Sequence, residues 1–162
     1  MAPTEMNSTP QAAICATFSK VTPPEASNLS ISPEHPTTTD DLVVNYTYYD
    51  AEGDSENGTE IRWYRNDVLQ VNLNDTLTVP SQFTQKGDIW YFTVKPKDGK
   101  VFGELVQSPS VTIENTPPTI TSYTPENLTP TIHEGESLEF THTSYDPDND
   151  TLYYTWLLDS AE

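Results

Sequence analysis

Apolar and polar residues alternate along several short stretches of this chain, and each stretch predicts a β-strand. Residues 42–48 place Leu42, Val44 and Tyr46 on one face, and residues 89–95 place Trp90 and Phe92 on one face. Shorter segments of the same kind predict further strands at 28–32, 61–64, 77–79, 102–106, 111–113, 120–123, 138–144 and 152–158. No long stretch shows the 3.6-residue period of a helix, so we expect an almost entirely β protein.

One pattern occurs twice. Residues 145–156 read Tyr-Asp-Pro-Asp-Asn-Asp-Thr-Leu-Tyr-Tyr-Thr-Trp, and residues 49–63 repeat the Tyr-Asp step, the alternating acids and the final Trp with a longer loop. The apolar positions before it also correspond, and so do Thr22-Pro23-Pro24 and Thr116-Pro117-Pro118. A repeat of this length indicates a tandem array of one kind of unit.

The repeat divides the chain into three parts. Residues 1–24 form an N-terminal tail that ends in a possible strand, residues 25–115 form a complete unit, and residues 116–162 form a second unit with only its first three strands. About seven short strands in the complete unit, with Trp63 on the third, predict an immunoglobulin-like β-sandwich. The predicted fold class is therefore all-β, with such sandwiches in tandem.

The unfinished second unit predicts a partner. Half of a sandwich leaves Phe140, Tyr154 and Trp156 uncovered and strand edges unpaired. A neighbouring copy could complete it by adding a strand, with residues 11–20 as the donor, and repetition of this head-to-tail contact would give a filament. One donated strand is fewer than the unit lacks, and the alternative is that the sequence is simply cropped within the repeat.

Charge narrows the choice of partners. Seven basic against 25 acidic residues give a net charge of −18, which disfavours nucleic acid and anionic lipid. No apolar segment is long enough to insert into a membrane. The single cysteine, Cys15, excludes an internal disulfide and is either a small buried side chain or an intermolecular thiol.

The repeated acidic loops are the candidate metal sites. Acidic side chains at alternate positions can turn several oxygens towards a hard cation such as calcium, although Asp and Asn also form turns without metal. Neither loop has the glycine or the final glutamate of an EF-hand, and Asp98, Glu114 and Asn115 are further possible ligands. The predicted calcium ligands are Asp50, Glu52, Asp54, Asp146, Asp148 and Asp150.

Asn-x-Ser/Thr sequons are frequent, which favours a glycosylated extracellular protein over a chance excess in a Thr-rich chain. They lie at Asn7, Asn28, Asn45, Asn57, Asn74, Asn127 and Asn149. No catalytic motif is found, and His35, His133 and His142 lack the spacing of a zinc site, so we expect no enzyme. Tyr64 and Tyr153 are predicted to point outward and could stack on sugars.

The 145–156 motif, Asn-Thr-Pro-Pro at 115–118 and Gly-Asp-Ile-Trp-Tyr-Phe-Thr-Val-Lys-Pro-Lys-Asp-Gly at 87–99 resemble tandem immunoglobulin-like repeats of archaeal and bacterial surface proteins, related to PKD and cadherin-like domains. The resemblance implies an extracellular stalk, adhesin or cell-envelope component, sometimes with calcium. We therefore expect a non-enzymatic structural or adhesive surface protein, with copies of itself or neighbouring repeats as partners. The alternative is a glycan-binding or spacer module of a larger secreted enzyme.

Overall fold

A computed structural model describes residues 21–157, and its regular structure is almost entirely β. Within that range there is no α-helix, and two short 3₁₀ turns, η1 (Val71–Leu73) and η2 (Ser81–Phe83), are the helical elements. The strands are β1 (Glu25–Ser32), β2 (Leu42–Tyr49), β3 (Glu60–Arg65), β4 (Val68–Leu69), β5 (Thr78–Val79), β6 (Ile89–Lys95), β7 (Val106–Gln107), β8 (Val111–Thr112), β9 (Thr119–Thr124) and β10 (Thr141–Tyr145).

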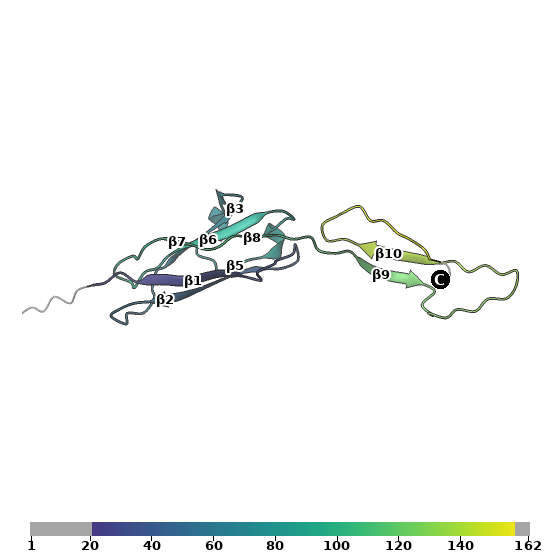
Figure 1. Cartoon of the computed structure of the whole chain (residues 1–162), viewed down its shortest axis with the longest axis horizontal. Helices are drawn as coiled ribbons and strands as arrows, with labels where there is room; N and C mark the ends of the chain where they lie inside the picture. The colour runs from purple at the N-terminus through teal and green to yellow at the C-terminus, as the bar shows by residue number, and fades with distance from the viewer. Residues whose placement is uncertain (1–20, 158–162) are drawn as a thin grey trace, which may run out of the picture.

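Two antiparallel sheets form a sandwich from residues 25–115 (Figure 1). One sheet has the order β1-β2-β5, and the other has the order β4-β3-β6-β7 with β8 also paired to β6. The long central pair β3 and β6 is in register from Glu60↔Lys95 to Arg65↔Trp90. A bulge in β1 at Asn28 and Leu29 interrupts its ladder with β2. The expected all-β sandwich is therefore confirmed.

The core lies between the two sheets because alternate residues of β2, β3 and β6 point inward. Trp63 is fully buried, with its ring 5.3 Å from that of Phe92 and 6.2 Å from that of Trp90. The Trp63 indole nitrogen donates a 3.0 Å hydrogen bond to the Thr76 carbonyl, so its one polar group is satisfied. Leu42, Val44, Ile61, Val79, Val94, Val111 and Ile113 complete this core.

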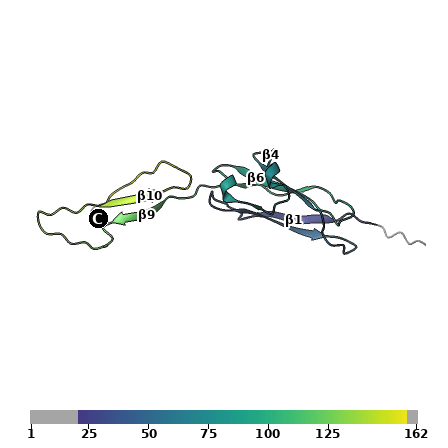
Figure 2. The same ribbon diagram turned by 180° about the vertical axis from the view of Figure 1, so that it is seen from behind.

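The remaining residues form what we call the C-terminal unit, residues 116–157. Its two strands, β9 and β10, make a separate antiparallel sheet that begins at Thr119↔Tyr145. The unit lies beyond one end of the sandwich and not against its flank, as Figure 1 and the reverse view in Figure 2 both show. The Thr116-Pro117-Pro118 segment joins the two.

Three sequence predictions need correction. Residues 152–157 form no strand, because the sheet partner that β6 provides for β3 has no counterpart in the C-terminal unit. The return from Phe102 is mostly irregular, and only Val106 and Gln107 pair with β6 as β7. The 138–144 strand is shifted to Thr141–Tyr145.

Residues 97–100 form a tight turn after β6. Gly99 adopts a φ of 84°, and the turn closes with a Lys97↔Phe102 bridge. A positive φ is the reason that the turn needs glycine at this position.

Candidate functional site

The acidic loop of the C-terminal unit follows β10 directly and is built around one carboxylate. The Asp146 side chain is 5% exposed, and its Oδ1 accepts hydrogen bonds from the amides of Asp148 at 2.8 Å and Asp150 at 3.1 Å. Asn149 takes a left-handed φ of 57°, which lets the chain turn within a few residues. Asp146 therefore shapes the loop so that the next two acids turn towards it.

The structure brings these three acids together. One carboxylate oxygen each from Asp146, Asp148 and Asp150 lies within 4.8 Å of the others. The second Asp146 oxygen, Oδ2, is buried and has no hydrogen-bond partner in the described part of the chain. A buried, unpaired carboxylate oxygen is costly unless something positive neutralises it. These residues could supply part of the oxygen shell that calcium requires.

Thr116 at the start of the C-terminal unit and Thr38 of the sandwich both contact the same loop. The Thr116 amide donates a 2.7 Å hydrogen bond to Asp148, and the Thr116 and Thr38 hydroxyls lie 2.7 Å apart. The hydrogen bond from the Thr38 hydroxyl, followed by that from the Thr116 amide, lowers the pKa of Asp148. The loop therefore binds the segment through which the chain enters its own unit.

Lys86 supplies the only cation that reaches this cluster among residues 21–157. It lies in the turn between η2 and β6, and its Nζ is 2.6 Å and 2.7 Å from the two Asp150 oxygens and 3.1 Å from Asn115 Oδ1. The hydrogen bond to Asp150 raises the pKa of Lys86. Lys86 was not among the residues predicted from the sequence. Its position as one of only 7 basic residues in the chain was the signal that could have drawn attention to it.

The first acidic loop, at the other end of the sandwich, repeats this arrangement in part. Asp50 Oδ1 accepts the amides of Glu52 at 3.0 Å and Asp54 at 2.8 Å, and its Oδ2 is also buried without a partner. Thr22 donates its amide and its hydroxyl to Glu52, at 3.3 Å and 2.7 Å. Each loop therefore binds the threonine of the Thr-Pro-Pro segment that precedes it.

The first loop differs in how its acids are disposed. In residues 21–157, Asp50, Glu52 and Asp54 do not form a compact group like that around Asp146. Glu52 is turned towards Thr22, and Asp54 pairs with Lys100 at 2.5 Å. The spacing of the acids is the same in both loops, and the three additional residues of the first loop lie between Asp54 and Trp63.

The other possible ligands have partners of their own. Asp98 Oδ1 caps its own turn through the amides of Lys100 at 2.6 Å and Val101 at 2.7 Å. Glu114 lies 3.1 Å from His35 across the end of the sandwich. Asn115 is held by Lys86, so of these three residues it alone adjoins the Asp146 cluster.

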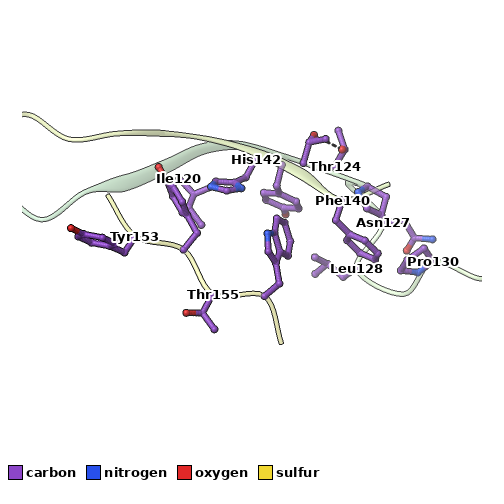
Figure 3. A pocket seen from close by; sticks show the side chains of 14 residues that line it. Ile120, Thr124, Asn127, Leu128, Pro130, Phe140, His142, Tyr153 and Thr155 are labelled. Carbon is purple, nitrogen blue, oxygen red and sulfur yellow. Dashed lines mark hydrogen bonds between the residues drawn. The ribbon is translucent and has the colours of Figure 1, made fainter. Parts of the chain in front are cut away.

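An open apolar face is the second candidate site, and Figure 3 shows its side chains. Trp156 is 62% exposed and Phe140 is 53% exposed, with their ring centroids 6.1 Å apart. His142 packs edge-on against Tyr154 at 4.3 Å and Trp156 at 5.5 Å. No Asp, Glu, Lys or Arg lines the pocket, which is formed by Ile120, Tyr123, Thr124, Pro125, Asn127, Leu128, Pro130, Phe140, Thr141, His142, Tyr153, Tyr154, Thr155 and Trp156.

The sandwich shows how the corresponding positions are covered there. Trp63, which the sequence repeat aligns with Trp156, is fully buried beneath β6 and its neighbours. Leu42 and Val44 are also buried, whereas Phe140 is exposed. In the described residues of the C-terminal unit, no strand takes the place of β6 or β8. The open face therefore has the composition of a sandwich core without its second sheet.

The two tyrosines predicted to point outward differ. Tyr64 is half-buried and stacks on Tyr91, with the rings 4.9 Å apart and 7° from parallel, so one face of its ring is occupied. Tyr153 is 91% exposed at the rim of the open face. His133 lies in an exposed turn, where its amide donates to Glu136 at 2.9 Å.

Most of the sequon asparagines are accessible. Asn28, Asn45, Asn57, Asn127 and Asn149 are exposed, and Asn74 is half-buried with its Oδ1 enclosed. Asn7 and Cys15 lie outside the described residues. The structure thus leaves room for glycans at five of these positions.

Comparisons with protein-family models, with curated proteins and with solved structures returned no match for this chain. Within residues 21–157, no helix has the length and apolar character needed to span a membrane. The two acidic loops and the open apolar face are therefore the features of the molecule that bear on its function.

Proposed function

We propose that this chain is a non-enzymatic structural or adhesive protein of the extracellular surface, built from immunoglobulin-like repeats. The observation that carries this proposal is the shared design of the two acidic loops. In each, the first Asp organises the loop through the amides two and four residues later, and the second acid binds the threonine of a Thr-Pro-Pro segment. The same contact between an acidic loop and the segment that enters the unit occurs twice, and such recurrence is typical of a linear array of repeats.

Assembly through the open face is the second part of the proposal. A donated β-strand from a neighbouring copy covers Phe140 and Trp156 in place of the missing sheet. The donor is the 11–20 segment, Gln-Ala-Ala-Ile-Cys-Ala-Thr-Phe-Ser-Lys, which contains no acidic residue in a chain of net charge −18. Lys20 at its end is its only charged residue, and the uncharged residues 11–19 match a face that also lacks Asp, Glu, Lys and Arg. Such head-to-tail contacts continue without closing and produce a filament.

Electron microscopy of the full chain tests the assembly. Phe18→Asp disables the donor, and Trp156→Asp disables the acceptor, so neither variant alone should form filaments. A mixture of the two should form a dimer and nothing larger, because the intact donor of one variant can still enter the intact acceptor of the other. Monomers at all concentrations of the unmodified protein, or a mixture that stays monomeric, would refute strand donation.

Calcium binding is the proposed role of the Asp146 loop. The close approach of three carboxylates and the unpaired Asp146 Oδ2 support it. A bound cation would reduce repulsion within a chain of net charge −18 and would stiffen the joint between the sandwich and the C-terminal unit. Isothermal titration of the metal-free protein with calcium measures this directly, and the absence of heat at millimolar calcium would remove the metal from the proposal.

Glycan binding by a module of a larger secreted enzyme is the alternative function. The almost fully exposed ring of Tyr153, beside Tyr154 and Trp156, is the observation in its favour, because sugars stack on flat aromatic surfaces. Binding to a glycan array that is lost in Tyr153→Ala but kept in Tyr64→Ala would support this alternative.

A further inference from the structure

The Lys86 ammonium group occupies part of the space in which a cation would be held. It lies 2.6 Å and 2.7 Å from the two oxygens of Asp150 and 3.1 Å from the Asn115 carbonyl oxygen. Asp150 is also one of the three acids whose oxygens lie within 4.8 Å of one another. With both its oxygens bound by Lys86, Asp150 cannot at the same time bind a second positive ion with full strength.

We propose that Lys86 is a built-in cation of this acidic cluster, and that Lys86 and a divalent cation compete for Asp150. With Lys86 in place, a direct ion pair from the sandwich holds the C-terminal unit. With a divalent cation in place, Asp150 turns to the metal and Lys86 is released to solvent. This inference rests on the proposed calcium site and adds that the sandwich itself regulates the affinity of that site.

The acids that Lys86 does not contact give the competition its direction. Lys86 contacts Asp150 and Asn115 but makes no hydrogen bond to Asp146, whose Oδ2 is buried without a partner. A divalent cation held by one oxygen from each of the three acids would bind Asp146 and Asp148 as well as Asp150. The metal therefore satisfies a group that the lysine does not, and this difference is what allows it to displace the lysine.

The strength of the Lys86 pair is suited to displacement. The Lys86 and Asp150 side chains are 44% and 40% exposed, so water and salt weaken their attraction. If the Lys86–Asp150 ion pair is formed in about four-fifths of the molecules, Asp150 is free to bind metal in the remaining one-fifth. The apparent affinity for the metal is then about fivefold lower than it would be without the ion pair. A modest pair can therefore tune binding without blocking it.

The first acidic loop provides a matched control. Lys100 pairs there with Asp54 at 2.5 Å, just as Lys86 pairs with Asp150. The two lysines are similar in exposure and in type of partner, but the acids around Asp54 do not form the compact group seen around Asp146. Replacement of Lys100 removes the same charge from the same chain without touching the proposed site.

Calcium titration of the full chain, Lys86→Gln and Lys100→Gln tests the competition. We expect Lys86→Gln to bind calcium about three to five times more tightly than the unmodified chain, and Lys100→Gln to bind it unchanged. Equal affinity in all three proteins, or weaker binding by Lys86→Gln, would overturn the proposal while leaving the calcium site intact. Absence of binding in all three would overturn both.

Small-angle scattering in EDTA supplies a readout that does not depend on metal affinity. The unmodified chain should show one narrow distribution of distances between the sandwich and the C-terminal unit, and Lys86→Gln should show a broader one. Calcium should make the two proteins alike again, because the metal then holds the joint in both. If the scattering profiles of Lys86→Gln and the unmodified chain are identical in EDTA, the Lys86–Asp150 ion pair does not hold the C-terminal unit in place.

Discussion

Replacement of Trp63 by alanine should destabilise the sandwich far more than replacement of Trp156 by alanine destabilises the monomer. The repeated motif aligns the two tryptophans, but Trp63 is 0% exposed and Trp156 is 62% exposed. Trp63 also packs on Trp90 and Phe92 and donates to the Thr76 carbonyl at 3.0 Å. Its removal leaves a large cavity and an unpaired carbonyl.

The expected magnitudes follow from burial. A large aromatic truncated in a packed core costs about 3–5 kcal/mol, and the unpaired Thr76 carbonyl places Trp63→Ala in the upper part of that range. For a domain of this size, at about 4–8 °C per kcal/mol, a loss of about 4–5 kcal/mol should lower the melting temperature by roughly 16–40 °C. Trp156→Ala, which removes an exposed ring, should change the unfolding free energy of the monomer by less than about 1 kcal/mol.

Urea unfolding followed by far-ultraviolet circular dichroism measures both variants at a concentration where the protein is monomeric. If Trp63→Ala does not fold, Trp63→Phe provides a milder change at the same position. Equal losses at Trp63 and Trp156 would mean that something in the same chain covers Trp156, and the reasoning about the open face would then be wrong.

Three further predictions concern Asp146, the pH dependence of stability and Gly103. In EDTA, Asp146→Asn should be at least as stable as the unmodified chain, because the substitution removes one of three neighbouring negative charges. In millimolar calcium the variant should melt at a lower temperature than the unmodified chain, because it has lost a calcium ligand. The same order of melting temperatures in both buffers would contradict this prediction. The free energy of unfolding should fall on acidification below about pH 4, because hydrogen bonds lower the folded-state pKa of Asp40, Asp98 and Asp148. The stabilisation from these three carboxylates is complete above the unfolded pKa of about 3.9 and is lost as the pH drops through the folded values. Denaturation midpoints measured at several pH values check this. Gly103→Ala should destabilise the sandwich by about 1–3 kcal/mol or more, because its Cβ would lie 1.8 Å from the Pro24 carbonyl oxygen, and an unchanged melting temperature would rule out that close approach.

The sequence predicted the central strands because burial and pattern agree there. In β2 and β6, every second residue is large and apolar, and those residues form the core between two sheets. The 152–158 segment has the same alternation but forms no strand within residues 152–157. A strand needs a partner as well as a pattern, and β3 has β6 beside it whereas the C-terminal segment has no such neighbour. Pattern alone does not report the presence of a partner.

The candidate site was predicted in outline only. The spacing of Asp146, Asp148 and Asp150 indicated a cluster, and the structure brings their oxygens together. The same spacing suggested an equivalent cluster at Asp50, where the acids instead bind Thr22 and Lys100. Lys86 is 64 residues from Asp150 in the chain, and no local pattern connects two residues so far apart.

The contacts at the joint also bear on how the chain would respond to a pulling force. Among residues 21–157, surface polar contacts from Thr38 and Lys86 connect the sandwich to the C-terminal unit, whereas the sandwich is held by backbone ladders over a closed core. Because exposed polar contacts are weaker than a packed core, we expect the joint to separate before the sandwich unfolds and to re-form when the force is removed. In the array proposed above, extension would then take place in small reversible steps before any Trp63 core is exposed.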